Sequence, residues 1–151
     1  KKVMVMLEFR NGEDEGLGIP LPRGTLRVYK KDIDGSSLLI GEDEIDHTPE
    51  DERVRLYIGD AFDIVGERIQ TDFRSDYDDD WMEESFEVTL RNHKDEDIQV
   101  RVVEHMFRWS EWSILESSHE YDKVDAQTIE FSVPVEAGGE TVVTYTVLYE
   151  W

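Results

Sequence analysis

The chain has 151 residues and a mass of 17.7 kDa, and its 38% hydrophobic and 11% aromatic content is enough for one domain with a packed core. Its 37 acidic and 16 basic residues give a formal net charge of −21, which opposes binding to nucleic-acid phosphates and to anionic membrane surfaces. The absence of cysteine excludes disulfides, thiolate nucleophiles and thiolate metal sites. No apolar run approaches the roughly 18 residues that a membrane-spanning helix needs, so we expect no membrane insertion.

Apolar and polar residues alternate with a period of two through most of the chain, which predicts strands rather than helices. Asn11-Gly12 ends the first predicted strand, and Asp34-Gly35 provides the turn chemistry of a hairpin between the second and the third. The predicted strands of this part are residues 3–9, 25–31, 37–42 and 53–58.

The second part of the chain continues the alternation, with predicted strands at residues 65–74, 85–92, 98–106, 112–117, 128–133 and 141–151. Strands joined by short turns, without helices to connect parallel neighbours, favour antiparallel pairing. We therefore expect an all-β fold of about nine strands, an antiparallel two-sheet β-sandwich of immunoglobulin-like topology, with a barrel as the alternative. Residues 1–151 are expected to form a single domain.

Three segments in order resemble a known family. They are LPRGTLRVYKKD (Leu21–Asp32), IGEDEIDHTP (Ile40–Pro49) and GDAFDIVGER (Gly59–Arg68), followed by a tyrosine-rich last strand. Together they resemble the C-terminal domain of unknown function of mucoidy inhibitor A-like bacterial proteins, over about residues 16–151.

The resemblance implies that the chain is the C-terminal domain of a longer protein. Proteins of this family usually begin with an export signal, so it also implies a place in the periplasm or cell envelope. It implies no catalytic residues, and the strong acidity of this chain is not part of the family pattern.

The adjacent pair Asp46-His47 is one candidate functional site. A carboxylate beside an imidazole can tune its basicity or supply two metal ligands. Adjacent residues of a strand point to opposite faces, however, so the pair acts together only in a turn. The alternative, which we favour, is a turn that Pro49 rigidifies and that these side chains cap.

Aromatic residues gather at Trp109 and Trp112, with Phe107 and Trp81 as further members. Such a group can form a stacking platform for a sugar or for the side chains of a partner protein. The alternative is that these rings belong to the core or cover the end of a sheet.

The acidic run with Asp76, Asp78 and Asp80 has the carboxylate spacing of a calcium loop, with Glu84 and Glu87 as later ligands. Its sixth position is Trp81 instead of glycine, and a strand follows instead of a helix, so an EF-hand is excluded. A weak surface calcium site remains as a hypothesis beside that of a solvated acidic loop.

The residue types of a hydrolase occur at residues 117–120 (SSHE), but without the G-x-S-x-G turn, and neither a Walker loop nor G-x-G-x-x-G is present. The sequence therefore favours a non-catalytic interaction or assembly module without a cofactor. Its expected partner is the N-terminal part of the same chain or another protein, and not nucleic acid. The alternative function is a carbohydrate- or calcium-binding domain.

Overall fold

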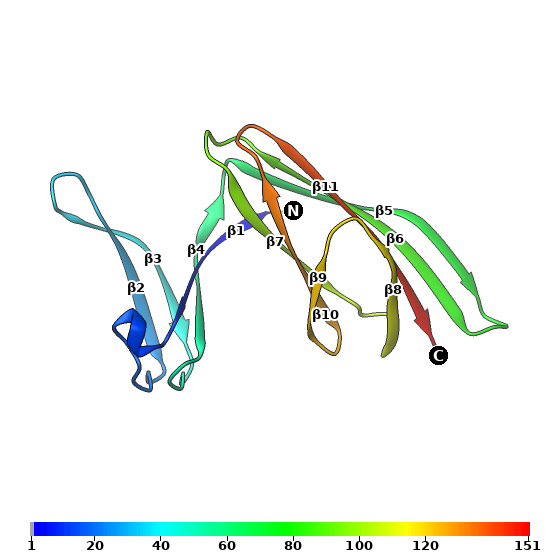
Figure 1. Ribbon diagram of the computed structural model, residues 1–151, viewed down its shortest axis with the longest axis horizontal. Coiled ribbons are helices and arrows are strands. Elements are labelled where there is room, and N and C mark those ends of the chain that lie inside the picture. The colour runs from blue at the N-terminus through cyan, green and yellow to red at the C-terminus, as the bar shows by residue number, and fades with distance from the viewer. Residues whose placement is uncertain (1) are drawn as a thin grey trace. The chain divides into compact units, whose positions relative to one another are not determined.

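The computed structural model describes residues 2–151, and in this part of the chain it contains eleven strands and one short 3-10 helix (Figure 1). All the strand pairings are antiparallel and no sheet closes on itself, so the prediction of an all-β antiparallel fold is confirmed. The strands fall into two compact units, residues 2–61 and residues 62–151. The single domain expected over residues 1–151 stays a prediction. Within residues 2–151, no helix has the length and hydrophobicity needed to cross a membrane.

Residues 2–61 contain two pairs of strands. The pairs are β1 with β4 and β2 with β3, and their bounds are β1 (Val3–Arg10), η1 (Glu13–Glu15), β2 (Gly24–Lys31), β3 (Ser37–Ile45) and β4 (Arg53–Ala61). The predicted Asp34-Gly35 turn joins β2 to β3, with Gly35 at a φ of 84° that favours glycine.

The two strand pairs of this unit meet where β3 contacts β4. An added Cβ on Gly41 would lie 3.1 Å from the backbone of Ile58, so a larger residue here would require the two strands to move apart slightly. Beside it, the backbone N–H of Tyr57 donates to the Asp43 carboxylate at 2.8 Å. Among the described residues of this unit, the buried hydrophobic side chains are only Val54 and Leu56 of β4.

Residues 62–151 form a four-stranded and a three-stranded sheet. The first has the order β5-β6-β11-β8 and the second β7-β10-β9. The bounds are β5 (Ile64–Asp76), β6 (Trp81–Asn92), β7 (Ile98–His105), β8 (Glu111–Ser117), β9 (Tyr121–Asp125), β10 (Thr128–Val135) and β11 (Glu140–Glu150).

The apolar faces of these two sheets pack against each other. The ring of Phe131 in β10 lies 5.7 Å from that of Tyr145 in β11, and Tyr145 lies 5.3 Å from Phe86 of β6. Val143 and Val147, which alternate with Tyr145 along β11, are fully buried. The period-two pattern of the sequence therefore corresponds to the inward faces of both sheets.

The number of strands differs from the prediction of about nine, because the described part of the chain contains eleven. One strand absent from the predicted set is β9, in which every residue from Tyr121 to Asp125 is exposed. A short edge strand with charged side chains buries no alternating apolar face, so hydrophobic periodicity cannot reveal it.

A buried asparagine ends a strand in each unit. The side-chain amide of Asn11 donates to the carbonyls of Ile19 (2.7 Å) and Pro49 (2.9 Å). The amide of Asn92 donates to the carbonyls of Glu96 and Glu136, at 2.8 and 3.0 Å. These bonds tie loops to strand ends, and they explain why a polar residue is buried at each position.

Candidate functional site

The core of residues 62–151 contains an ion pair between its two sheets. Arg68 of β5 donates to Glu104 of β7 at 2.9 Å, and the hydroxyl of Tyr145 in β11 donates to the same carboxylate at 2.7 Å. The Arg68 guanidinium also donates to the Tyr145 oxygen at 3.1 Å and lies 3.8 Å from the centre of the Phe86 ring. These three residues form a closed set of hydrogen bonds, which we call the inter-sheet triad.

A second buried carboxylate belongs to Glu84 of β6. Arg108, in the connection between β7 and β8, donates to it at 2.9 Å, and Gln70 of β5 donates at 3.2 Å. Nearby, the hydroxyl of Tyr149 contacts the sulfur of Met106 at 3.7 Å. The interpretation of Glu84 as a calcium ligand is therefore wrong, because its side chain lies in the core and is paired with arginine.

The buried phenols lie close to these carboxylates, which changes their acidity. Burial and the Glu104 carboxylate raise the pKa of Tyr145 well above its ordinary value. Burial and the charge of Glu84 raise the pKa of Tyr149 to about 12. Both phenols therefore stay protonated near neutral pH and act as hydrogen-bond donors.

The chemistry of these buried groups is that of a structural network. Within residues 2–151, every buried side-chain nitrogen and oxygen has a hydrogen-bond partner. Each buried carboxylate already has a guanidinium partner, so neither is open to a substrate. The sequence contained a signal for both positions, because Glu84 precedes the inward series Phe86 and Val88, and Glu104 follows Val100 and Val102 in the same alternation.

The predicted tryptophan pair is divided between two environments. Trp109 lies 5.6 Å from Trp151, which in turn lies 6.0 Å from Tyr77, measured between ring centres. We call Tyr77, Trp109 and Trp151 the aromatic end cluster. The ammonium nitrogen of Lys123 instead lies over Trp112, 4.3 Å from the centre of the Trp112 ring. The indole N–H of Trp112 donates to the Ala126 carbonyl at 3.0 Å.

The predicted calcium loop is a tight turn between β5 and β6, which we call the Asp turn (Asp76–Asp80). The Asp76 carboxylate accepts the backbone N–H groups of Asp78 (2.9 Å) and Asp79 (3.3 Å), which is an Asx-type turn. Within residues 2–151, no group of three or more His, Asp or Glu side chains is arranged so that it could hold a metal ion.

The Asp46-His47 segment lies in the irregular connection between β3 and β4. The Asp46 carboxylate accepts the backbone N–H of His47 at 2.9 Å, and the His47 ring accepts the backbone N–H of Arg23 at 3.3 Å. Each side chain therefore accepts a backbone N–H group. The Asp46 carboxylate and the His47 imidazole do not hydrogen-bond to each other.

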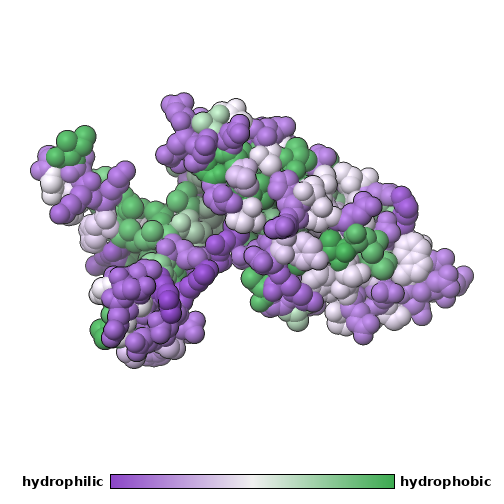
Figure 2. All heavy atoms as spheres, viewed as in Figure 1, coloured by the Kyte–Doolittle hydropathy of each residue, from purple (hydrophilic) through white to green (hydrophobic). Residues whose placement is uncertain are grey.

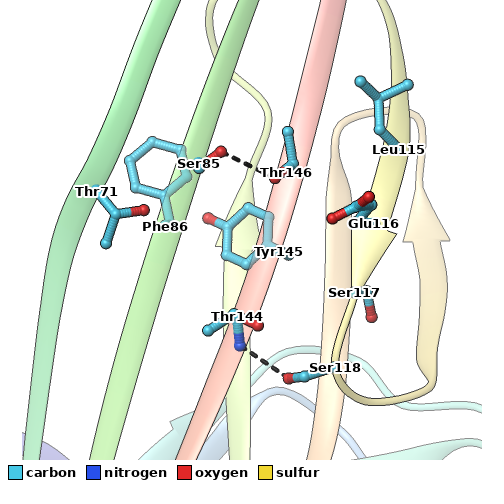
Figure 3. A pocket seen from close by; sticks show the side chains of 10 residues that line it. All are labelled: Thr71, Ser85, Phe86, Leu115, Glu116, Ser117, Ser118, Thr144, Tyr145 and Thr146. Atoms are coloured by element: carbon cyan, nitrogen blue, oxygen red, sulfur yellow. Dashed lines mark hydrogen bonds between the residues drawn. The ribbon is translucent and has the colours of Figure 1, made fainter.

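A shallow depression of about 630 Å³ lies over the four-stranded sheet and is rich in hydroxyl groups (Figure 3). Ser85 and Thr146 are joined at 2.9 Å, and the Ser118 hydroxyl accepts the backbone N–H of Thr144 at 2.8 Å. Ser118 also lies 2.8 Å from Nδ1 of His119, and the Ser117 hydroxyl donates to the His119 carbonyl. Both serines thus hold the turn that follows β8.

The most unusual surface of residues 2–61 is β1. Four consecutive apolar residues of this strand, Met4 to Leu7, are 40–63% exposed. In β3, Leu38, Leu39 and Ile40 are likewise exposed. Hydrophobic residues are visible on the surface of this unit in Figure 2. Because neighbouring residues of a strand point to opposite faces, both faces of β1 present apolar side chains to solvent.

Comparison with protein-family models gave no match, and comparison with curated proteins and with solved structures gave no similar protein. The resemblance to the C-terminal domain of mucoidy inhibitor A-like proteins therefore stays a prediction.

Proposed function

We propose that the chain is a non-catalytic interaction and assembly module in which β1 takes up an extended segment of polypeptide. The observation that carries this proposal is the exposure of Met4, Val5, Met6 and Leu7 along one strand. Soluble proteins rarely leave contiguous apolar patches uncovered, and those they leave often mark binding surfaces.

The pairing of β1 supports an added strand as the binding mode. Among the described residues, β1 forms a ladder only with β4, so its second edge has no strand beside it. Such an edge offers a row of backbone donors and acceptors to an extended peptide, and alternating side-chain positions then provide specificity. An apolar segment would cover Met4 and Leu7 on the two faces while completing the ladder.

The proposed partner is a segment from the N-terminal part of the same protein or from another protein. A place in the bacterial periplasm or cell envelope is proposed with it, and this location rests on the family resemblance alone. A non-catalytic role is supported by the hydrogen bonds of Asp46, His47 and Ser118, each of which accepts a backbone N–H group.

For residues 62–151 we propose a two-sheet sandwich that is immunoglobulin-like in its numbers of strands. Four and three strands are the numbers of a constant-type immunoglobulin domain. The strand order differs, because β11 lies in the four-stranded sheet between β6 and β8, whereas the last strand of a constant-type domain lies in the three-stranded sheet.

Photocrosslinking in the cells that make the protein tests the function. A photoreactive phenylalanine analogue replaces Met4 in one variant and Ile33 in a control variant, since Ile33 lies in the turn after β2 and is fully exposed. We expect a defined adduct from position 4 that disappears when Leu7→Lys is added. An adduct within one polypeptide identifies the same protein as the partner, and an adduct of higher mass identifies another protein.

Two outcomes would contradict the proposal. One is the same adducts from positions 4 and 33, which would indicate nonspecific contact. The other is no adduct from position 4 in any fraction, which would mean that β1 stays exposed to solvent.

A carbohydrate- or calcium-binding domain is the second candidate, favoured by the exposed rings and carboxylates at Tyr77 to Asp80. Thermal unfolding with and without calcium, at constant ionic strength and with magnesium and EDTA controls, tests the calcium part. A ligand at about 100 times its Kd stabilises by about 2.7 kcal/mol. A calcium-specific rise in Tm supports the second candidate, and equal shifts with magnesium contradict it.

A further inference from the structure

We propose that the aromatic end cluster and the Asp turn together bind the cationic side chain of an arginine or lysine in a basic segment of a partner polypeptide. This surface belongs to residues 62–151, so the proposal goes beyond the β1 interaction and does not rest on it.

Strand register brings the parts of this surface to one end of the four-stranded sheet. Glu150 of β11 lies opposite Trp81 of β6 and opposite Glu111 of β8, and Asp76 of β5 also lies opposite Trp81. The residues just beyond these positions are Tyr77, Trp109 and Trp151. The backbone N–H of Trp151 donates to the Asp80 carbonyl at 3.1 Å, which fixes it to the Asp turn.

The three rings form an accessible, tilted arrangement around Trp151. Tyr77 and Trp109 each make an angle of 51° with the Trp151 ring. Their exposed fractions are 71% for Tyr77, 48% for Trp109 and 38% for Trp151. Ring faces of tryptophan and tyrosine attract cations, and tryptophan does so most strongly.

Two carboxylates of the Asp turn add negative charge that has no partner within the described residues. The carboxylates of Asp78 and Asp79 are exposed, and no hydrogen bond or ion pair to them occurs in residues 2–151. A guanidinium or ammonium group placed on the rings would gain a charge-assisted contact with such a carboxylate. The overall charge of −21 would also steer a basic partner toward the chain.

Elsewhere in the same unit, rings already hold cations in this way. Lys123 lies over Trp112 at 4.3 Å and Arg68 over Phe86 at 3.8 Å. No lysine or arginine of residues 2–151 lies over Trp109 or Trp151, so these two rings are available for a cation from another molecule.

Charge favours a basic polypeptide over the other classes of ligand. Nucleic acids and anionic lipids are repelled by the Asp turn. A neutral sugar would stack on the rings but would gain no ion pair from Asp78 and Asp79. Arginine fits best, because its planar group stacks on an aromatic ring and pairs with a carboxylate at the same time.

Fluorescence anisotropy of a labelled arginine-rich peptide, titrated with the protein, tests the proposal. The comparison ligand is the same peptide with citrulline in place of arginine, which keeps the shape of the side chain and removes its charge. We expect Trp109→Ala and Tyr77→Ala each to weaken binding of the arginine peptide by about two- to fivefold. Both residues are exposed, and urea unfolding of each variant checks that the fold is retained.

A matched pair of charge variants separates a local site from general attraction. Asp78→Asn with Asp79→Asn, and Asp95→Asn with Glu96→Gln in the turn after β6, each remove two negative charges. The proposal requires the first pair to weaken binding several-fold more than the second.

Three outcomes would overturn it: equal binding of the citrulline peptide, equal effects of the two charge pairs, or binding of a neutral oligosaccharide that needs Trp109 while the arginine peptide does not. The last outcome would assign the cluster to a carbohydrate. Because none of these variants touches β1, a failure here is distinguishable from a failure of the photocrosslinking test.

Discussion

Replacement of Arg68 by methionine tests whether the inter-sheet triad is a closed network. Methionine keeps much of the length and packing of the arginine stem and removes the charge. The variant leaves Glu104, whose side chain is 8% exposed, with the Tyr145 hydroxyl as its hydrogen-bond donor. An uncompensated buried charge of this kind costs about 3–5 kcal/mol. We therefore expect Arg68→Met to lower the free energy of unfolding by about that amount.

The opposite single replacement is predicted to cost less. In Glu104→Leu the remaining Arg68 side chain is 22% exposed, so its guanidinium can move toward water. We expect a loss of about 2 kcal/mol from the unpaired groups that remain.

Removal of the whole triad provides the decisive comparison. Arg68→Met with Glu104→Leu still leaves the Tyr145 hydroxyl buried without its two partners, which costs about 1–3 kcal/mol. Adding Tyr145→Phe removes that hydroxyl and keeps the ring against Phe131. The triple variant is therefore expected to be more stable than Arg68→Met alone, since well-packed apolar groups can replace a buried ion pair at little cost.

Equilibrium urea unfolding followed by tryptophan fluorescence measures these differences. All four tryptophans lie in residues 62–151, so the signal reports on the unit that contains the triad. The energies are compared only among variants with the same m value. A loss below about 1 kcal/mol in Arg68→Met, or additive losses that make the triple variant the least stable, would refute a closed and desolvated network.

Three further predictions concern stability, each measured by urea unfolding. Because the pKa of Tyr149 is raised to about 12 in the folded state, stability falls as the pH rises from 10 toward 12, by about 1 kcal/mol per pH unit for this group, and Tyr149→Phe should reduce that slope. Asn92→Ala should cost about 3 kcal/mol by removing the buried amide that donates to the carbonyls of Glu96, Val135 and Glu136, while a neutral result for it would contradict the role of its amide; exposed His93→Ala is the control. Raising the salt concentration from about 0.01 to about 0.5 M should stabilise the fold by screening the charge of −21, and a loss of stability would contradict that self-repulsion is significant.

Sequence periodicity predicted the elements whose stability comes from one buried face. In β6 and β11 the residues of the alternation, such as Val88 and Val143, are the buried ones, and the two lie opposite each other in the register. The turn at Asp34-Gly35 was equally accessible to prediction, because a positive φ at Gly35 is a local requirement.

The inter-sheet triad could not be assembled from the sequence. Arg68, Glu104 and Tyr145 belong to three different strands, and their contact depends on the order β5-β6-β11-β8 and on the packing of a second sheet. Alternation places Glu104 on an inward position, but it contains no information about which cation lies opposite. What the sequence does indicate is that Glu104, a charged residue in an otherwise apolar alternating series, is buried and needs a polar partner.

The aromatic groups illustrate the same limit. Trp109 and Trp112 are close in sequence, yet Trp109 contacts Trp151, which is 42 positions away in the chain. That contact follows from the pairing of Glu111 with Glu150 at the ends of β8 and β11. Local residue spacing groups Trp109 with Trp112, whereas the fold places Trp109 beside Trp151 and Trp112 beside Lys123.

The exposed apolar residues of β1 bear on folding as well as on binding. An isolated two-stranded sheet is marginally stable at best in water, and in the described part of residues 2–61 only Val54 and Leu56 provide a buried hydrophobic core. Covering Met4 to Leu7 with a partner strand would remove apolar surface from water and satisfy the second edge of β1 at the same time. Any segment that binds the folded form alone must also stabilise it. If the proposed function is correct, amide hydrogen exchange in β1 should slow strongly in the assembled protein, whereas exchange in the fully buried centre of β11 should change little.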